Sequence, residues 1–282
     1  MSQTRPTLFV PPGHFYSPIP DPGEVAAHLE RRGKRPLHGI DLDMDAMRGV
    51  FSDIAARSAD MPFTWDRQPN YRYYYGNDQF TYGDAAVLFS MMDRLRPARV
   101  IEIGSGHSSA LLLDARDSLG IDTHLSFIEP YPTRLDALLR DADRDGVTVH
   151  RKKVQDVPLV TFDALQANDI LIIDSSHVAK TGSDVCFEIF EILPRLKPGV
   201  RVMIHDMFNG FEYPRQWSVD EGRAWNELYL VRAFLMFNDR VEIEFFNDAF
   251  AAANKKLVKD TAGPFAQNPG GSLWLTIADP KA

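Results

Sequence analysis

The chain of 282 residues has a single cysteine, no long apolar run and no basic cluster, and each absence excludes a class of protein. Cys186 alone can form neither an intrachain disulfide nor a thiolate-based metal site, and its apolar neighbours favour a buried, inert thiol. No stretch approaches the roughly 18 to 20 apolar residues that a membrane span needs. The N-terminus also lacks the pattern of a secretory signal, so we expect a cytoplasmic protein with no membrane partner.

Acidic residues outnumber basic ones by 39 to 31, which gives a formal net charge of −8. Proteins that bind nucleic acid usually contact phosphates through clustered Lys and Arg. Because this chain has no such run, we expect no nucleic-acid partner and a small molecule instead.

Residues 1–81 are rich in proline, aromatic residues and charges, and turn signals interrupt them repeatedly. We predict that this range is an N-terminal extension or lid with one or two helices, and not a second core. Apolar residues at helical spacing place one helix over residues 43–59.

From residue 99 onward, short β-branched or aliphatic runs alternate with amphipathic segments. This alternation is typical of βα units and of a parallel sheet covered by helices on both faces. Two closing strands, over residues 241–247 and 272–279, are predicted to form a hairpin with no helix between them. The helices are expected over residues 82–95, 108–119, 133–143, 183–193 and 224–236. We therefore predict an α/β fold over residues 82–282, with a doubly wound, mostly parallel, seven-stranded sheet.

A glycine turn follows the first strand of this pattern. The turn and the start of the next helix provide glycines and small polar residues: Gly104, Ser105, Gly106, Ser108 and Ser109. The glycines let backbone amides approach a ligand closely, and either Ser108 or Ser109 can cap the helix. Glu102, two residues before the turn, would repel a pyrophosphate but suits a ligand with an ammonium group. The methionine part of S-adenosylmethionine has such a group.

Acidic and amide side chains follow the second and third strands. Glu129, about 25 residues beyond Gly104, can accept hydrogen bonds from both hydroxyls of a ribose. Gln155 and Asp156 come after the third strand, and either can bind the amino group of an adenine. Ordinary turn polarity is the alternative interpretation of these two residues.

Four ionisable residues follow the fourth and fifth strands. Asp174 and His177 come after the run DILII, and His205 and Asp206 come after VRVMI. The carboxyl ends of adjacent parallel strands are neighbours, so we expect these side chains to converge beside the cofactor crevice. If S-adenosylmethionine lies in this crevice, transfer of its methyl group requires that the acceptor oxygen is held near the methyl carbon and loses its proton. We predict Asp174 and Asp206 as ligands of a divalent cation and His177 as the base. His205 is a further ligand or catalytic group, or a partner that orients Asp206.

The order EIGSG, FIEP, QD, LIIDSSH, LKPG and IHD resembles the class I S-adenosylmethionine-dependent methyltransferases over residues 82–279. Among these, the chain is most similar to metal-assisted O-methyltransferases of the macrocin and mycinamicin type and to the related cephalosporin-cluster enzymes. The resemblance implies that Asp174 also borders the cofactor, and that the segment from Asp174 to His177 supplies one metal ligand and the base. An acidic pair ends the fifth strand of those enzymes, but here His205 replaces its first member. This departure leaves open Mg²⁺, a cation that accepts nitrogen ligands such as Mn²⁺, Fe²⁺ or Zn²⁺, or no metal.

Aromatic residues gather in two places that flank these positions. One is the N-terminal stretch around Tyr16, and the other is the loop after Asp206, with Phe208, Tyr213 and Trp217. Such segments can close over an acceptor and exclude water, so we predict these four aromatic residues as walls of the acceptor pocket. The extension can equally cover a neighbouring subunit, which leaves a homo-oligomer open.

These patterns predict an enzyme that methylates a hydroxyl group on a small metabolite, either a sugar or a polyketide-like compound. Two alternatives stay open at the level of sequence. One is N-methylation of a small amine, which needs no metal and a weaker base, and the other is a cofactor-binding protein that has lost the transfer activity.

Overall fold

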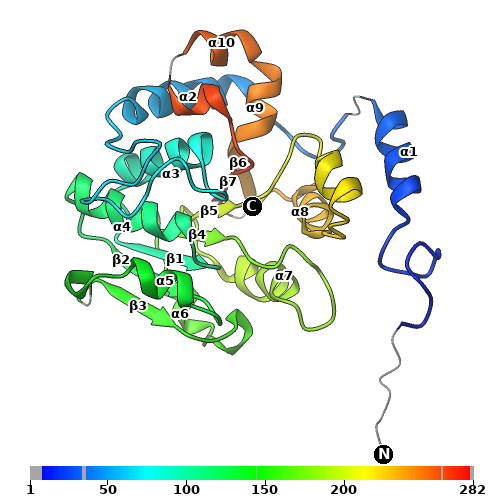
Figure 1. Ribbon diagram of the computed structural model, residues 1–282, viewed down its shortest axis with the longest axis horizontal. Coiled ribbons are helices and arrows are strands. Elements are labelled where there is room, and N and C mark those ends of the chain that lie inside the picture. The colour runs from blue at the N-terminus through cyan, green and yellow to red at the C-terminus, as the bar shows by residue number, and fades with distance from the viewer. Residues whose placement is uncertain (1–7, 34–35, 144, 262, 280–282) are drawn as a thin grey trace, which may run out of the picture.

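A seven-stranded sheet runs through the centre of the molecule in the order β3-β2-β1-β4-β5-β7-β6 (Figure 1). The computed structural model describes residues 8–33, 36–143, 145–261 and 263–279. The strands are β1 (Arg99–Ile103), β2 (His124–Ile128), β3 (Val147–His150), β4 (Ile170–Ile173), β5 (Arg201–Ile204), β6 (Val241–Phe246) and β7 (Leu273–Ile277). Strands β1 to β5 are parallel to one another, and β7 is antiparallel to both of its neighbours. The predicted doubly wound, mostly parallel sheet is thus confirmed.

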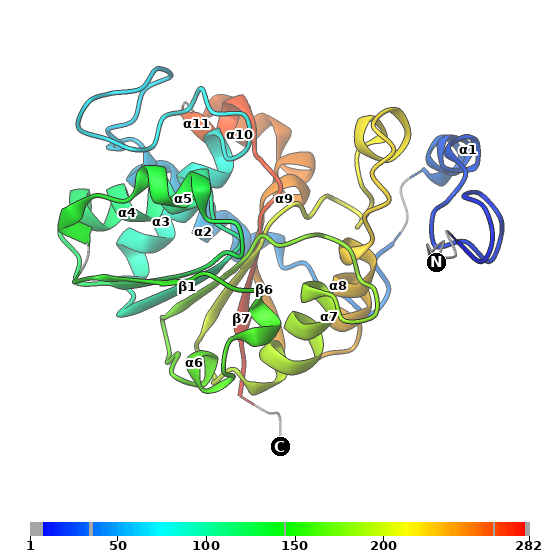
Figure 2. The same ribbon diagram turned by 60° about the horizontal axis from the view of Figure 1, so that its bottom comes forward.

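Helices cover both faces of the sheet (Figure 2). One face carries α2 (Met44–Ser58), α3 (Tyr82–Leu95), α4 (His107–Leu119) and α5 (Thr133–Leu138). The other face carries α6 (Val160–Asp163), α7 (Asp184–Phe187) and α8 (Glu227–Leu235). Because the strands from β1 to β5 all run in the same direction, their carboxyl ends meet at one edge of the sheet. Among the described residues, no helix combines the length and the apolar character of a membrane span.

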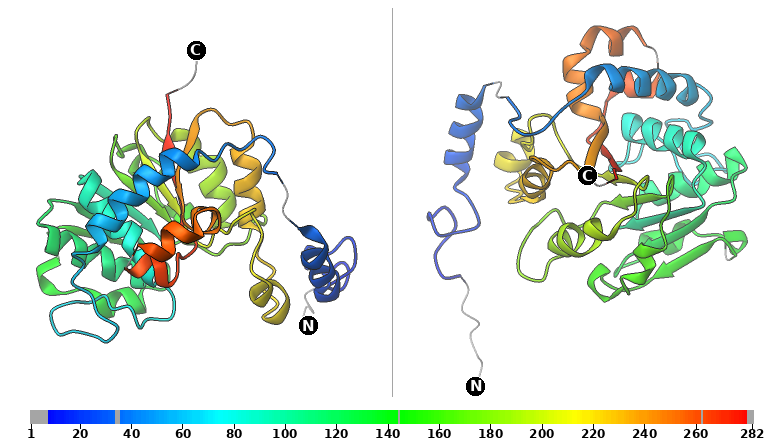
Figure 3. Two further views of the ribbon diagram at one scale, coloured as in Figure 1. Left: turned by 90° about the horizontal axis from the view of Figure 1, so that it is seen from above. Right: turned by 180° about the vertical axis from the view of Figure 1, so that it is seen from behind.

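The N-terminal range has two described helices, which differ in how they pack against the rest of the molecule. Helix α2 begins after Asp43, whose carboxylate accepts a hydrogen bond from the backbone N–H of Ala46 at 2.9 Å, and it buries Met47 and Phe51 in the main core. Helix α1 (Pro22–Arg32) buries none of its residues and stands apart from the sheet, as both views of Figure 3 show. The described part of the N-terminal range, residues 8–33 and 36–81, therefore contains two helices, and of these α2 packs into the core.

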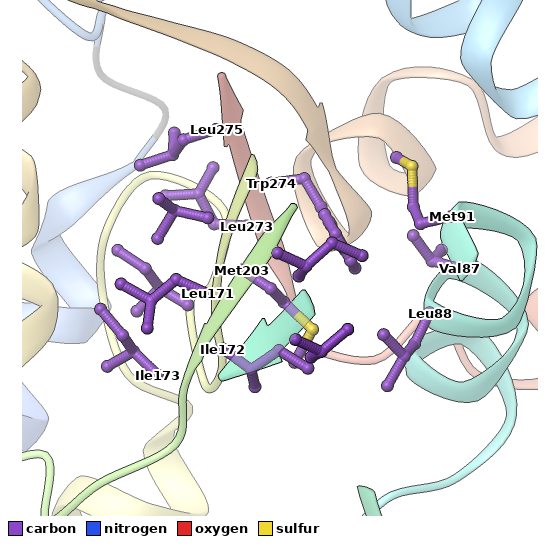
Figure 4. Packing of buried hydrophobic residues seen from close by; sticks show 14 of the residues in the cluster. Val87, Leu88, Met91, Leu171, Ile172, Ile173, Met203, Leu273, Trp274 and Leu275 are labelled. Atoms are coloured by element: carbon purple, nitrogen blue, oxygen red, sulfur yellow. The ribbon is translucent and has the colours of Figure 1, made fainter. Parts of the chain in front are cut away.

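Apolar side chains from the central strands and α3 fill the core. All four residues of β4 are buried, as expected for a strand covered on both faces. Leu171 and Ile173 point to one face of the sheet, and Ile172 points to the other, toward Val87 and Leu88 of α3 (Figure 4). Burial of each such side chain stabilises the fold by about 1.5–3 kcal/mol. This packing fixes the end of β4, where the candidate site lies.

The two closing strands pair antiparallel, but their connection is not a simple turn. Residues 247–272 contain α9 (Asn247–Ala253), α10 (Lys255–Asp260) and α11 (Pro264–Gln267), so the prediction of no helix between the strands was wrong. Phe250 and Phe265 explain the helices, since both are buried against Phe51 of α2 with ring centroids 4.8 and 5.2 Å away. Contacts with a distant helix therefore order this segment.

The helix predicted over residues 133–143 ends early, at Leu138. The last residues form a short 3-10 helix, because the carboxylate of Asp143 turns inward and accepts hydrogen bonds from Arg72 at 2.9 Å. This buried ion pair joins residues that are 71 positions apart, which local spacing does not predict.

Two further helices also differ from their predicted extent. The helix predicted over residues 183–193 continues beyond α7 as a wider π-helix and then as a 3-10 helix. The helix predicted over residues 224–236 begins only at α8, because Asn226 is bonded to the loop after β4. The 3-10 and π-helical segments of the described residues are Asp141–Asp143, Val154–Asp156, Glu188–Ile192, Leu193–Arg195 and Gln216–Asp220.

Candidate active site

The glycine turn after β1 touches the end of β4. Gly104 has a φ of +79°, and a Cβ atom placed on it would lie 1.8 Å from the carbonyl oxygen of Asp174. Only glycine allows this approach, because any side chain would overlap the neighbouring backbone. The contact brings Asp174 beside the turn, although the two residues belong to different βα units.

A cleft of about 490 Å³ lies along this edge of the sheet. Its lining includes four residues that were predicted to bind the cofactor: Gly104, Glu129, Gln155 and Asp174. Glu129 accepts a hydrogen bond from the backbone N–H of Ser105 at 3.2 Å, which links the turn to the end of β2. Gln155 donates to the carbonyl of Gly182 at 2.9 Å. Asp156 is exposed and does not line the cleft, so of the two alternatives Gln155 is the residue that faces it.

Glu102 lies beneath the glycine turn and is completely buried, so it does not line the cleft. Its Oε2 accepts a hydrogen bond from the hydroxyl of Ser109, and that hydroxyl accepts one from the backbone N–H of Gly106 at 3.0 Å. Burial raises the pKa of Glu102 to about 8. Helix α4 begins at His107, so Ser108 is in its first turn and is not its cap. A direct contact between Glu102 and the ligand stays a prediction, whereas the structure shows its carboxyl group holding the turn.

An acid–imidazole cluster adjoins the cleft at the ends of β4 and β5. Nε2 of His177 lies 3.5 Å from Oδ1 of Asp174 and 3.4 Å from Oδ2 of Asp206. Ligand atoms of these three residues all lie within 4.8 Å of one another, close enough for one cation to contact them all. Nδ1 of His205 lies 3.4 Å from Asp174 and 3.5 Å from Asp206. The four residues that were predicted to converge therefore lie together.

Three consecutive residues after Asp174 each bond to a carboxylate. The pairs are Ser175 with Glu188 at 3.0 Å, Ser176 with Asp184 at 2.6 Å and His177 with Glu227 at 2.8 Å. These bonds hold a strained backbone, since His177 has a φ of +58°, which residues other than glycine seldom adopt. Asp206, after β5, has the same φ. Strain that the surrounding structure supports in this way is concentrated at functional sites.

The charges of the cluster stabilise one another. Burial opposes a charged imidazole, but hydrogen bonds to Asp174 and Glu227 outweigh it and raise the pKa of His177 to about 10. Burial also opposes a charged Asp174, yet the nearby imidazoles, His205 first, lower the pKa of Asp174 well below its usual range. Burial raises the pKa of Asp206. The carboxylates thus attract positive charge into the space between them.

Two acids at the cluster were missing from the prediction. Asp84 of α3 lies 3.4 Å from Nε2 of His205 and accepts a hydrogen bond from the backbone N–H of Gly271, 187 positions away. Glu227 is 1% exposed and lies on the same face of α8 as Val231, which is fully buried. A charge on an apolar face is a usable signal, because a buried charge needs a partner. Asp84 carries no such local signal.

Three of the four predicted wall residues form one aromatic group near the cluster: Phe208, Tyr213 and Trp217. Trp225, which was not predicted, completes the group, with its ring centroid 5.4 Å from that of Trp217 and 4.4 Å from that of His177. Tyr16 is 67% exposed, and its ring packs against the neighbouring Phe15 instead. The aromatic group therefore borders the imidazole, and Tyr16 is not part of it.

Residues 101–207 match the profile of a family described as a methyltransferase domain. This range contains both the glycine turn and the acid–imidazole cluster. A protein of Archaeoglobus fulgidus, described as uncharacterized, is 34% identical over 177 residues, which are 57% of this chain and 75% of that protein.

Two solved structures have a similar chain path at low identity. The O-methyltransferase TomG from Streptomyces achromogenes, involved in tomaymycin synthesis and solved with SAM, is 15% identical, with a TM-score of 0.44, over 85% of this chain and 92% of that one. A structure of CmcI with Mg and SAM is 18% identical, with a TM-score of 0.40, over 79% and 84%. Likenesses this distant do not assign a function.

Proposed function

We propose that the chain is a class I S-adenosylmethionine-dependent methyltransferase, which the family match over residues 101–207 and the strand order support, and that it methylates a hydroxyl group of a small metabolite. In this proposal Asp174 and Asp206 bind a divalent cation, and His177 accepts the hydroxyl proton. One observation carries the proposal: Asp174 lines the cofactor cleft and also belongs to the acid–imidazole cluster. The two parts of the reaction would therefore share one edge of the sheet.

The residues of the cleft fit S-adenosylmethionine, which when bound supplies an electrophilic methyl group on a sulfonium. Gly104 lets the end of β4 approach the glycine turn, which places Asp174 at the cleft, and Glu129 can accept hydrogen bonds from the ribose hydroxyls. The nearby carboxylates favour a cationic sulfonium over a neutral or anionic ligand.

The cluster fits a divalent cation, which when bound supplies positive charge that lowers the pKa of the acceptor hydroxyl. Nδ1 of His205 faces both Asp174 and Asp206, at 3.4 and 3.5 Å, so an imidazole stands beside the two carboxylates. Two carboxylates with an adjacent imidazole suit Mn²⁺, Fe²⁺ or Zn²⁺ better than Mg²⁺, which prefers oxygen ligands. The replacement of an acid by His205 thus changes which metal is expected.

His177 is placed to take the proton of the acceptor. Its Nδ1 bonds to Glu227, which leaves Nε2 facing Asp174 and Asp206. Of the three carboxylates that raise the pKa of His177, Asp174 and Asp206 are the ones that would bind the cation, whereas Glu227 would stay bonded to the imidazole. Once their charge is neutralised, the imidazole can lose its proton and act as a base near neutral pH. Glu227 then stabilises the imidazolium that forms.

Methyl transfer from labelled S-adenosylmethionine to panels of hydroxyl and amine acceptors, with and without EDTA, tests the proposal. We expect labelled hydroxyl acceptors, loss of transfer in EDTA and recovery with Mn²⁺. His177→Ala should lower the rate by about 10²–10⁴-fold while cofactor binding persists. His124→Ala, at an exposed histidine at the start of β2, should have no effect. Amine products formed at full rate in EDTA, or full activity of both His177→Ala and Asp174→Asn, would contradict the proposal.

A further inference from the structure

A second and larger cavity, of about 1140 Å³, lies between the N-terminal segment and the chain that leads from β5 to α8. One wall comes from residues 17–31, which include most of α1. The opposite side, which we call the floor, comes from residues 212–229. Figures 1 and 3 show α1 beside this part of the chain. Sites for small ligands usually measure roughly 300 to 1,000 Å³, so this cavity has room for a molecule of several rings.

The floor is attached directly to His177. The backbone N–H groups of Asn226 and Glu227 both donate to the carbonyl of His177, at 3.0 and 3.1 Å. Trp225, the preceding residue, lines the cavity and also lies against the imidazole, with 4.4 Å between the ring centroids. Trp225 is therefore a wall that the cavity and the acid–imidazole cluster share.

We propose that this cavity binds the body of the methyl acceptor and that the acceptor is a flat aromatic phenol. Its hydroxyl group reaches His177 past the edge of Trp225. The inference rests on the proposed function for the reacting group, and it adds the class of acceptor and the place where the acceptor binds.

Aromatic faces are the main feature that the floor offers to a ligand. The rings of Tyr213 and Trp225 meet edge to face with centroids 6.0 Å apart. The guanidinium of Arg223 lies 4.6 Å from the centre of the Trp225 ring and 4.4 Å from that of Trp217, so a flat ligand would stack on this planar group or replace it. An aromatic ring packs well in such surroundings, and Arg223 is itself held in place by Glu221 at 2.6 Å.

The polar groups of the floor are already bonded within the protein. The hydroxyl of Tyr213 accepts a backbone N–H of α8 at 3.3 Å, and the side chain of Asn226 bonds in both directions with the backbone of Ala179. Glu212 pairs with Arg32 at 3.2 Å. Recognition of a sugar needs several free donors and acceptors, because each of its hydroxyls that loses water must find a partner. The floor therefore suits an aromatic ring better than a sugar, whereas the opposite wall also carries charged side chains, among them Glu24 and Arg31.

Two matched substitutions of valine by tryptophan test the cavity. Val25 is on α1, where no residue is buried, so Val25→Trp fills the cavity without disturbing the core. Val160 on α6 is 69% exposed and does not line the cavity, so Val160→Trp is the control. The probe is 2,3-dihydroxynaphthalene, with methyl α-glucopyranoside for comparison. Calorimetry gives the dissociation constants of each probe and of S-adenosylmethionine for the full chain and both variants.

We expect Val25→Trp to weaken diol binding by about tenfold or more, because the added indole takes up the volume of a ring. Val160→Trp should bind the diol as the unmodified chain does, and the affinity for S-adenosylmethionine should be the same in all three proteins. Equal diol affinity in Val25→Trp and the unmodified chain would overturn the inference. Binding of the glucoside in place of the diol would overturn it as well.

Product analysis separates this inference from the proposed function. Diol that binds in the cavity but is never methylated supports the binding site and contradicts O-methylation. Hydroxyl methylation that is unaffected by Val25→Trp contradicts the binding site and leaves the proposed reaction standing.

Discussion

Replacement of Gly104 by alanine tests the contact that brings the cofactor cleft and the acid–imidazole cluster together. The new Cβ would lie 1.8 Å from the carbonyl oxygen of Asp174, whereas real Cβ contacts are essentially never under 3.0 Å. Either the glycine turn or the end of β4 must therefore move by about 1 Å, and a misplacement of that size can cost about a hundredfold in rate. We expect Gly104→Ala to weaken S-adenosylmethionine binding and to lower kcat/KM by about that factor.

Gly120→Ala provides the matched control. Gly120 follows α4 with a φ of +57°, and a Cβ placed on it meets no atom within 4 Å. Both substitutions force alanine into the left-handed region, at a cost of about 1–2 kcal/mol each. Thermal unfolding should therefore show a lower Tm in both variants, while calorimetry with S-adenosylmethionine should show a loss only for Gly104→Ala. If Gly104→Ala keeps both cofactor affinity and activity within twofold of Gly120→Ala, the contact does not organise the site.

Three further outcomes follow from buried charges. Glu227→Gln should lower kcat by about 10–100-fold, because His177 loses the charge that stabilises its imidazolium. Cofactor affinity, measured by calorimetry, should stay constant, and an unchanged kcat would contradict this role. Arg72→Met leaves buried carboxylates without their partner and should lower the free energy of unfolding in urea by about 3–5 kcal/mol, whereas Arg151→Met, in an exposed ion pair, should change it little. Glu102 keeps its proton in the folded state up to a pKa of about 8, against an ordinary value of 4.5, so stability should fall as the pH rises between these values. Glu102→Gln should remove that fall in urea titrations at pH 5 and 9, and an identical pH dependence in both proteins would contradict it.

The parallel part of the sheet could be predicted because its signals are local. A strand such as β4 is buried on both faces and is therefore a continuous apolar run, and a glycine turn follows β1. The helices between β6 and β7 could not be predicted in this way. Phe250 and Phe265 are ordered by contacts with Phe51, about two hundred positions earlier in the chain, and no local spacing contains that information.

The residues of the candidate site also differ in whether the sequence alone can place them. The topology alone brings together Asp174, His177, His205 and Asp206, because they follow adjacent parallel strands. Asp84, Glu227 and Trp225 reach the cluster from other elements, so only the folded structure places them there. Glu102 is an intermediate case, since the sequence places it beside the turn but does not show that it is buried beneath it.

The distance between a bound Mn²⁺ ion and the methyl group of S-adenosylmethionine tests most directly whether the cleft and the cluster share one edge. Mn²⁺ is paramagnetic and broadens the NMR signals of nearby nuclei, with an effect that falls steeply with distance. With cofactor labelled with carbon-13 in the methyl group and no acceptor, we expect a strongly broadened methyl signal for the unmodified chain. Asp206→Asn should restore a sharp signal without loss of cofactor binding, because Asp206 belongs to the cluster but does not line the cleft. A sharp methyl signal from the unmodified chain with both Mn²⁺ and cofactor bound would contradict the shared edge.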